Sequence, residues 1–159
     1  MSFIIDTNIF ITSKNTLPMD VWTTFWNKFA QIVNSGEAFS IEAVKKEIDK
    51  GRDALTQWVK ENVPHSFFIP PDQDVMGKYA AIMQWAGNKQ YKISAINEFA
   101  TVADSYLVAT AAAKGMTVVT YEKPSPNSQK RILIPDVCNA FGVPYCDLND
   151  MLRNMGITI

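Results

Sequence analysis

A short apolar run near the start of the chain, Phe3-Ile4-Ile5, stops abruptly at the polar tripeptide Asp6-Thr7-Asn8. Strands buried on both faces of a parallel sheet read as continuous apolar runs, and polar groups at their C-terminal ends line ligand crevices. A carboxylate, a hydroxyl and an amide are poorly placed there for core packing but well placed to hold a metal ion. The run therefore predicts a buried strand whose end belongs to a functional site.

Further apolar runs alternate with helical patterns along the chain. Strands are predicted at 38–41, 67–69, 116–120 and 132–134. Helices are predicted at 18–35, 42–51, 54–63, 75–86, 103–114, 135–141 and 148–155. The aromatic stripe of the first helix is compatible with a nucleobase platform, but its three-four spacing favours core packing. Strands separated by helices imply an α/β fold, with a mainly parallel sheet covered by helices on both faces.

The size and composition of the chain set limits on its class. With 159 residues the chain is expected to form one domain, 1–159. Its 15 basic and 16 acidic side chains nearly balance, so the net charge does not indicate a nucleic-acid partner. Cys138 and Cys146 have no CxxC spacing, so we expect buried reduced thiols. No stretch approaches the ~20 apolar residues of a membrane span and no signal peptide is evident, so a cytoplasmic protein is expected.

Two acids are expected at the C-terminal edge of the sheet. Asp6 follows the first strand directly, with a turn acid or a helix N-cap as its alternative role. Glu122 follows the run Val118-Val119-Thr120 by two residues. Parallel strands end at the same edge, so these two carboxylates are expected near each other, although Glu122 taken alone reads as an ordinary loop acid.

Two further acids are expected on helices that pack against the sheet. Glu47 borders the apolar face of the helix after residue 41, where its alternative role is a solvated rim position and where Glu42 is its rival. Asp104 lies among small and apolar residues at helical spacing, with no basic residue between Lys92 and Lys114. Its alternative role is stabilisation of the helix start by free backbone N–H groups.

Four acids that converge would form a site for a hard divalent cation, because Mg²⁺ and Mn²⁺ prefer oxygen ligands. His65 is the single histidine, so a zinc site or a histidine-dependent triad has little support. The sequence has neither a P-loop nor a GxGxxG motif to hold a nucleotide. A metal-carboxylate hydrolase requires neither.

At these residues the chain resembles PIN-domain proteins, and more narrowly the small prokaryotic VapC-type ribonucleases. The matching blocks occur in the family's order at 3–8, 44–48, 103–113 and 118–122, and the run Ile134-Pro-Asp-Val-Cys138 fits a PIN-like subfamily. The resemblance implies a PIN-like three-layer α/β/α sandwich. It also implies that the acids after strand one, in the early helix and at the later helix start bind Mg²⁺ or Mn²⁺; here these are Asp6, Glu47 and Asp104.

The resemblance also assigns supporting roles at the two strand ends. Thr7 and Asn8 would support the first acid, and Thr120 ends the strand that leads to the fourth acid. The family commonly has Thr-Asp or Ser-Asp there, whereas this chain reads Thr120-Tyr121-Glu122, with a longer acid one position later. Whether Glu122 binds the metal directly or through water, and whether one or two ions bind, stays open.

The activity implied by the resemblance is metal-dependent endoribonuclease cleavage that leaves 5′-phosphate and 3′-hydroxyl ends, by the toxin of a type II toxin–antitoxin pair. A cognate antitoxin protein and a homodimer are the partners it implies. Substrate phosphates would meet basic residues near the cleft, which are Lys45, Lys46, Lys123, Lys130 and Arg131. Two alternatives stay open: a catalytically silent PIN-like module that binds RNA or protein, and a metal phosphohydrolase that acts on small phosphate esters.

Overall fold

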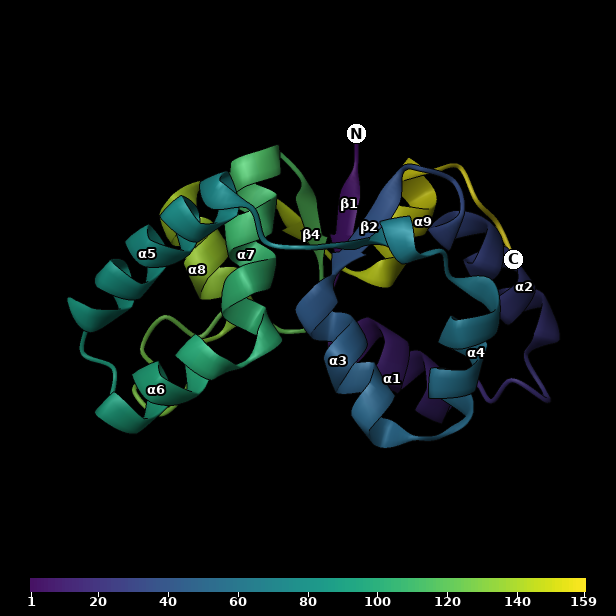
Figure 1. The fold of residues 1–159 in the computed structure, drawn as a ribbon, viewed down its shortest axis with the longest axis horizontal. Helices are drawn as coiled ribbons and strands as arrows, with labels where there is room; N and C mark the ends of the chain where they lie inside the picture. Colours follow the sequence, from purple (N-terminus) through teal and green to yellow (C-terminus); the bar gives the residue numbers. More distant parts are fainter.

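The structure, a computed structural model, describes all residues from 1 to 159 and has one five-stranded sheet (Figure 1). Its strands in chain order are β1 (Phe3–Ile5), β2 (Ala38–Ile41), β3 (Phe68–Ile69), β4 (Thr117–Val119) and β5 (Tyr145–Cys146). They lie in the order β3-β2-β1-β4-β5, and every neighbouring pair is parallel. The prediction of a mainly parallel sheet is therefore confirmed. The chain adds strands on one side of β1 and then on the other, so its direction reverses between β1 and β4.

Nine α-helices surround this sheet. They are α1 (Thr7–Thr16), α2 (Thr23–Val33), α3 (Glu42–Gly51), α4 (Ala54–Asn62), α5 (Gln73–Gly87), α6 (Ile93–Thr101), α7 (Ala103–Lys114), α8 (Ile134–Phe141) and α9 (Leu148–Asn154), with a 3₁₀ turn, η1 (His65–Phe67). Figure 1 shows α5 to α8 on the left of the strands and α1 to α4 on the right. Helix α7 packs against β2 and β4, while α2 packs against β2. This is the predicted arrangement of a parallel sheet between helices.

The aromatic stripe of α2 packs in the core, as its spacing favours. Phe25, Trp26 and Phe29 are all buried, and the rings of Trp26 and Phe29 stack with centroids 5.9 Å apart. Phe29 also contacts Phe10 of α1, at 5.3 Å between ring centroids. One continuous cluster of buried hydrophobic side chains joins these rings to the strands. No helix of the structure is both long enough and apolar enough to cross a membrane.

Helix α1 was not expected, and it begins directly after Asp6. The predicted first helix, 18–35, is shorter than expected, because residues 18–22 form a turn and α2 spans Thr23–Val33. Thr7–Thr16 contains mostly β-branched and Ser, Thr or Asn residues, which have weak helix propensity. Its helical state therefore depends on packing against α3 and α4, through buried residues such as Ile9 and Phe10.

The second half of the chain holds the other departures from the sequence predictions. Helix α6 was not predicted, and the predicted strand 132–134 is wrong, because Ile134 begins α8 with Pro135 in its first turn. The buried side chains of Ile132 and Ile134 give this loop the apolar character of a strand. The fifth strand is β5 instead, whose two residues are too few to give a pattern. Helix α7 ends where predicted, at Gly115, which has φ +68°.

The central position of β1 predicts a strong dependence of stability on its side chains. Replacement of the fully buried Ile4 by alanine is expected to reduce the free energy of unfolding by about 2–5 kcal/mol, since a cavity forms in the core. The same substitution at Ile93, which is 76% exposed, is expected to change it by less than about 0.5 kcal/mol. Urea unfolding of the two variants measures both values, and equal losses would contradict this account of the core.

Candidate active site

The ends of β1 and β4 bring Asp6 and Thr120 together. Ile5 and Val119 are register partners, and the Asp6 N–H continues the ladder by donating to the Val119 carbonyl at 3.0 Å. The next residue on each strand therefore lies at the same level of the sheet edge. There the Thr120 hydroxyl donates to Oδ2 of Asp6 at 2.8 Å. Asp6 is 3% exposed, which is unusual for a carboxylate without a cationic partner.

The Thr120 hydroxyl is also the acceptor of two hydrogen bonds. It accepts from the Asn8 side-chain amide at 3.4 Å and from the Glu122 N–H at 3.1 Å. The Asn8 carbonyl oxygen in turn accepts from the Tyr121 N–H at 3.3 Å. These bonds fix the segment after β4 against the start of α1. Asp6 stands at the N-cap position of α1, yet its side chain does not cap that helix. Its carboxylate points instead to the neighbouring strand end.

Glu47 of α3 reaches the same region. Thr7 donates its hydroxyl to Oε2 of Glu47 at 2.8 Å, and the Ala103 N–H donates to Oε1 at 3.2 Å. The Glu47 carboxylate therefore links α1, α3 and the first turn of α7. Its rival Glu42 pairs instead with Lys46 on the surface, with 3.7 Å between nitrogen and oxygen. The structure thus distinguishes the two acids of α3 by their contacts.

Asp104 lies in the first turn of α7 and shares a small pocket, of about 160 Å³, with Glu47. Burial first, then the charges of Glu122 and Glu47, raise the pKa of Asp104 to about 7. Burial first, then the charge of Asp104, raise the pKa of Asp6 to about 8, and Glu122 adds to this rise. The four predicted acids therefore share one electrostatic environment, although they come from four separate segments of the chain.

Glu122 is held by the first residue of α8 and by a side chain of the loop that follows Glu122. The Ile134 N–H donates to its Oε1 at 3.1 Å, and the Arg131 guanidinium lies 3.7 Å from its Oε2. The charge of Arg131 also lowers the pKa of Asp104, against the stronger effects that raise it. The sequence between Lys92 and Lys114 has no basic residue, but Asp104 still has a cation near it in space, because Arg131 comes from a loop far along the chain.

Sequence reasoning missed Glu98 altogether and named Arg131 only as a contact for substrate phosphates, not as a neighbour of the acids. Glu98 of α6 and Arg131 both line the pocket that Asp104 and Glu47 share, and Glu98 adds to the rise of the Asp104 pKa. Glu98 was missed because α6 was not predicted. The buried residues Ala95 and Phe99, four positions apart, were the signal that would have revealed this helix and its polar neighbour.

The donor set of this region suits a hard divalent cation. It consists of carboxylate, hydroxyl and amide oxygens, the ligands that Mg²⁺ and Mn²⁺ prefer. His65 lines a different pocket, and burial raises the pKa of the Cys138 thiol to about 12, so neither suits a zinc site here. As placed, no three acidic, histidine or cysteine side chains converge on one point, and Glu47 and Glu122 accept hydrogen bonds from groups of the protein.

Comparison with known proteins gives one family and several similar folds. The model of the family described as "Domain of unknown function (DUF4411)" matches residues 3–159, and no curated protein matches the sequence. A chain of the crystal structure of FitAcB from Neisseria gonorrhoeae is 18% identical, with 90% of this chain and 95% of that chain covered and a TM-score of 0.56. A chain of VapBC2 from Rickettsia felis, bound to a DNA fragment from its promoter, is 14% identical, with 92% of this chain and 98% of that chain covered and a TM-score of 0.54. A chain of FitAB bound to an IR36 DNA fragment is 18% identical, with 91% of this chain and 94% of that chain covered and a TM-score of 0.53. The fold is therefore the PIN-like α/β fold of these proteins.

The buried carboxyl of Asp6 predicts how stability depends on pH. Its pKa is about 8 in the folded protein, against 3.8 as the ordinary value. Between these two values the folded state binds more protons than the unfolded state, so the free energy of unfolding falls as pH rises from about 4 to about 8. Asp6→Asn removes this titration. In metal-free buffer the variant is expected to melt above the wild type at pH 8 and to lose that advantage near pH 4.

A matched control for this measurement is Asp20→Asn, an identical substitution at an exposed position. Its melting temperature is expected to follow that of the wild type at every pH. A wild-type stability that does not fall between pH 4 and 8, or an Asp6→Asn variant that melts below the wild type throughout, would contradict a raised pKa for the buried Asp6 carboxyl.

Proposed function

This chain belongs to the DUF4411 family, and from its PIN-like fold and its acidic site we propose that it is a metal-dependent endoribonuclease. The observation that carries the proposal is the gathering of acids in a partly enclosed site, where burial and then the charge of Asp104 raise the pKa of Asp6, and burial and then the charges of Glu122 and Glu47 raise the pKa of Asp104. Burial of two like charges without a cationic partner between them opposes folding. Such an arrangement is expected where a bound cation compensates for it during function.

In this proposal Asp6 and Asp104 bind Mg²⁺ or Mn²⁺ directly, while Glu47 and Glu122 complete the site directly or through water. When bound, such an ion lowers the pKa of water and neutralises negative charge on a phosphate. Thr120 orients the Asp6 carboxylate by its 2.8 Å hydrogen bond. Thr7 does the same for Glu47.

The basic residues of the loop after Glu122 would position the RNA backbone. The Arg131 side chain is 62% exposed while it contacts Glu122, so its solvent-exposed N–H groups can donate hydrogen bonds to a phosphate. Lys123 and Lys130 are exposed on the same loop. The expected reaction is hydrolysis of a phosphodiester bond that leaves a 5′-phosphate and a 3′-hydroxyl.

The biological setting that we propose is a toxin with a cognate antitoxin. Similar folds occur in the FitAB and VapBC2 complexes, which pair a toxin with an antitoxin. A short reading frame beside the gene for this chain, whose product binds the protein and suppresses its ribonuclease activity, would support this setting. A homodimer is the second assembly we expect, and light scattering of the purified protein tests it.

One observation favours an alternative, a silent PIN-like module that binds RNA or protein. Glu47 accepts two hydrogen bonds within the protein, and Glu122 accepts one and lies beside Arg131, so each of these two acids has more protein partners than Asp6 or Asp104. Mn²⁺ titration separates the two functions. A nuclease is expected to gain thermal stability with Mn²⁺, whereas a silent module is expected to show no carboxylate-dependent gain.

Asp104 provides the direct test of the nuclease proposal. Asp104→Asn keeps the size of the side chain but removes its charge, and it is expected to reduce Mg²⁺- or Mn²⁺-dependent RNA cleavage by about 100-fold or more. It is also expected to remove the Mn²⁺-dependent rise in melting temperature. Cleavage of a labelled RNA and thermal melting measure the two effects.

The control for this test is again Asp20→Asn, which lies in the exposed turn before α2. It is expected to cleave RNA and to respond to Mn²⁺ as the wild type does. Unchanged metal-dependent cleavage by Asp104→Asn would refute the site assignment. Absence of both cleavage and Mn²⁺ stabilisation in the wild type would favour the silent module.

A further inference from the structure

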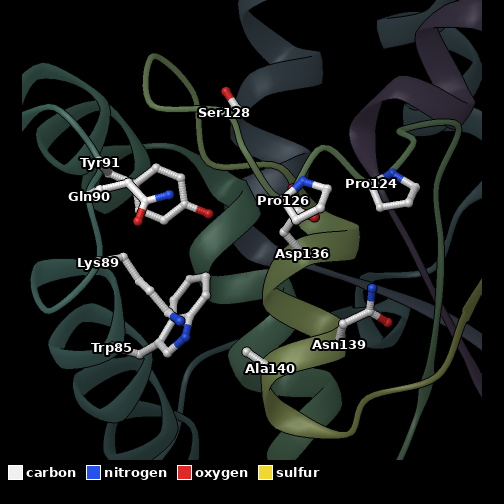
Figure 2. Close-up of a pocket in the computed structure, with 10 residues that line it drawn as sticks. All are labelled: Trp85, Lys89, Gln90, Tyr91, Pro124, Pro126, Ser128, Asp136, Asn139 and Ala140. Atoms are coloured by element: carbon white, nitrogen blue, oxygen red, sulfur yellow. The ribbon is translucent and has the colours of Figure 1, made fainter.

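A second cavity lies beside the acidic site, and none of the residues considered above as ligands lines it. It has a volume of about 350 Å³ and lies between the C-terminal end of α5, helix α8 and the loop 121–133 (Figure 2). Trp85 and Tyr91 stand on one side of it, and Asp136 and Ala140 stand on the other. The volume is in the range of cavities that hold small organic groups.

The aromatic side of the cavity is held in place by packing. The Trp85 ring contacts Tyr91 at 5.9 Å and Phe141 of α8 at 6.1 Å between ring centroids, with steep angles between the ring planes. Trp85 and Tyr91 are both partly buried, so each keeps part of its ring open to the cavity. Fixed, partly open aromatic rings of this kind are the surfaces on which proteins stack unpaired bases.

The polar groups of the cavity match the edge of a nucleobase. Asp136 is 8% exposed and contributes a carboxylate, which accepts hydrogen bonds. Figure 2 shows the Tyr91 hydroxyl pointing from the α5 side toward α8, with Gln90 beside it. Burial first, and then the charge of Asp136, raise the pKa of the Tyr91 hydroxyl, which therefore stays protonated. The cavity thus offers a strong acceptor together with groups that both donate and accept.

The cavity is tied to the acidic site by the loop between them. Pro124 lines the cavity and follows Glu122 by two residues, so their Cα atoms are within about 7 Å of each other. The Ser125 N–H donates to both oxygens of Asp136, at 3.1 and 3.0 Å, and the Ile134 N–H donates to Glu122. The start of the loop is therefore held to α8 at two points, which sets the position of the cavity relative to the Glu122 carboxylate.

Basic side chains lie between the cavity and the acidic site. Lys89 lies at the cavity with its Nζ 5.8 Å from the centre of the Trp85 ring, and Arg131 contacts Glu122 at the other end. Lys123 and Lys130 are exposed on the loop between them. A strand of RNA that follows these four cations would place its phosphates on the loop and a base at the cavity.

We propose that this cavity binds one base of the RNA, near the phosphate that the acidic site cleaves, and that it disfavours uracil. The proposal rests on the proposed function and adds a base-specific subsite to it. Adenine, cytosine and guanine carry an exocyclic amino group that can donate to the Asp136 carboxylate, whereas uracil offers only its ring N3–H, which lies between two carbonyl oxygens that the carboxylate would repel. Trp85 supplies the stacking surface, and Tyr91 reads a second position on the base edge.

The test measures binding rather than cleavage, with the full chain carrying Asp104→Asn so that the RNA stays intact. Short single-stranded RNAs of only A, only C or only U are titrated while tryptophan fluorescence is followed. The A and C strands are expected to quench fluorescence and to bind more tightly than the U strand. Trp85→Leu is expected to remove most of the quenching and to weaken binding of the A strand about tenfold.

Trp22→Leu is the matched control, because Trp22 precedes α2, which Figure 1 shows on the opposite side of the strands from α5. It is 49% exposed and does not line this cavity, so its loss is expected to leave affinity and base preference unchanged. Tyr91→Phe removes a single oxygen and serves as the second cavity variant should Trp85→Leu fail to fold. It is expected to reduce the preference against uracil a few-fold while thermal melting shows an intact fold.

The outcomes separate the subsite from the nuclease proposal. Base-dependent quenching that disappears in Trp85→Leu supports the subsite even if the wild type cleaves no RNA, and it would then belong to an RNA-binding module. Metal-dependent cleavage together with equal binding of the A, C and U strands overturns the subsite and leaves the nuclease intact. Equal affinities for Trp85→Leu and Trp22→Leu also overturn it, and the cavity would then serve a different ligand.

Discussion

The parallel pairing of β1 with β4 is the constraint on which the candidate site depends. Register between Ile5 and Val119 places the two following residues side by side, and the Thr120 hydroxyl then reaches the Asp6 carboxylate at 2.8 Å. A slip of one residue would turn alternate side chains to the opposite face and separate this pair. Because strand order also reverses between β1 and β4, the connections leave in opposite directions there, and the carboxyl ends of the strands are open to a ligand.

The same site is a local source of instability that the core has to offset. Asp6 is almost fully buried, and Asp104 is partly buried beside Glu47 and Glu122. The strand beneath Asp6 is fully apolar, with Ile4 and Ile5 at 0% exposure, so it stabilises the fold while its end carries the charge. Hydroxyl and backbone donors lower the cost at Asp6 and Glu47, but Asp104 has no such donor among the causes that act on its pKa. A site that opposes stability in this way is typical of function rather than of packing.

Local patterns predicted those elements whose own residues decide their structure. The strand 3–5 and the helix 103–114 were predicted with the bounds that the structure has, because each is a continuous apolar or helix-forming run. Helix α1 was missed, since contacts with α3 and α4 stabilise it more than its own residues do. Helix α6 was missed although its buried residues Ala95 and Phe99, four positions apart, gave a helical signal. The acids were found one by one from their positions on strands and helices. The Arg131–Glu122 pair was missed as a pair, because the course of the loop 121–133 depends on the Asp136–Ser125 and Glu122–Ile134 hydrogen bonds rather than on any periodic pattern.

The loop 121–133 has a double role that explains its composition. Glu122 at its start belongs to the acidic region, and Pro124 and Pro126 near its start line the cavity beside α8. Proline fixes φ and reduces the conformational freedom of the unfolded loop, so less conformational entropy is lost when this segment becomes ordered. A ligand at the cavity then meets a surface that is already positioned against Glu122. Because α8 provides Ile134 for one site and Asp136 for the other, a shift of this single helix would move both sites together. The loop and the start of α8 therefore form one hydrogen-bonded unit that joins the Glu122 carboxylate to the cavity.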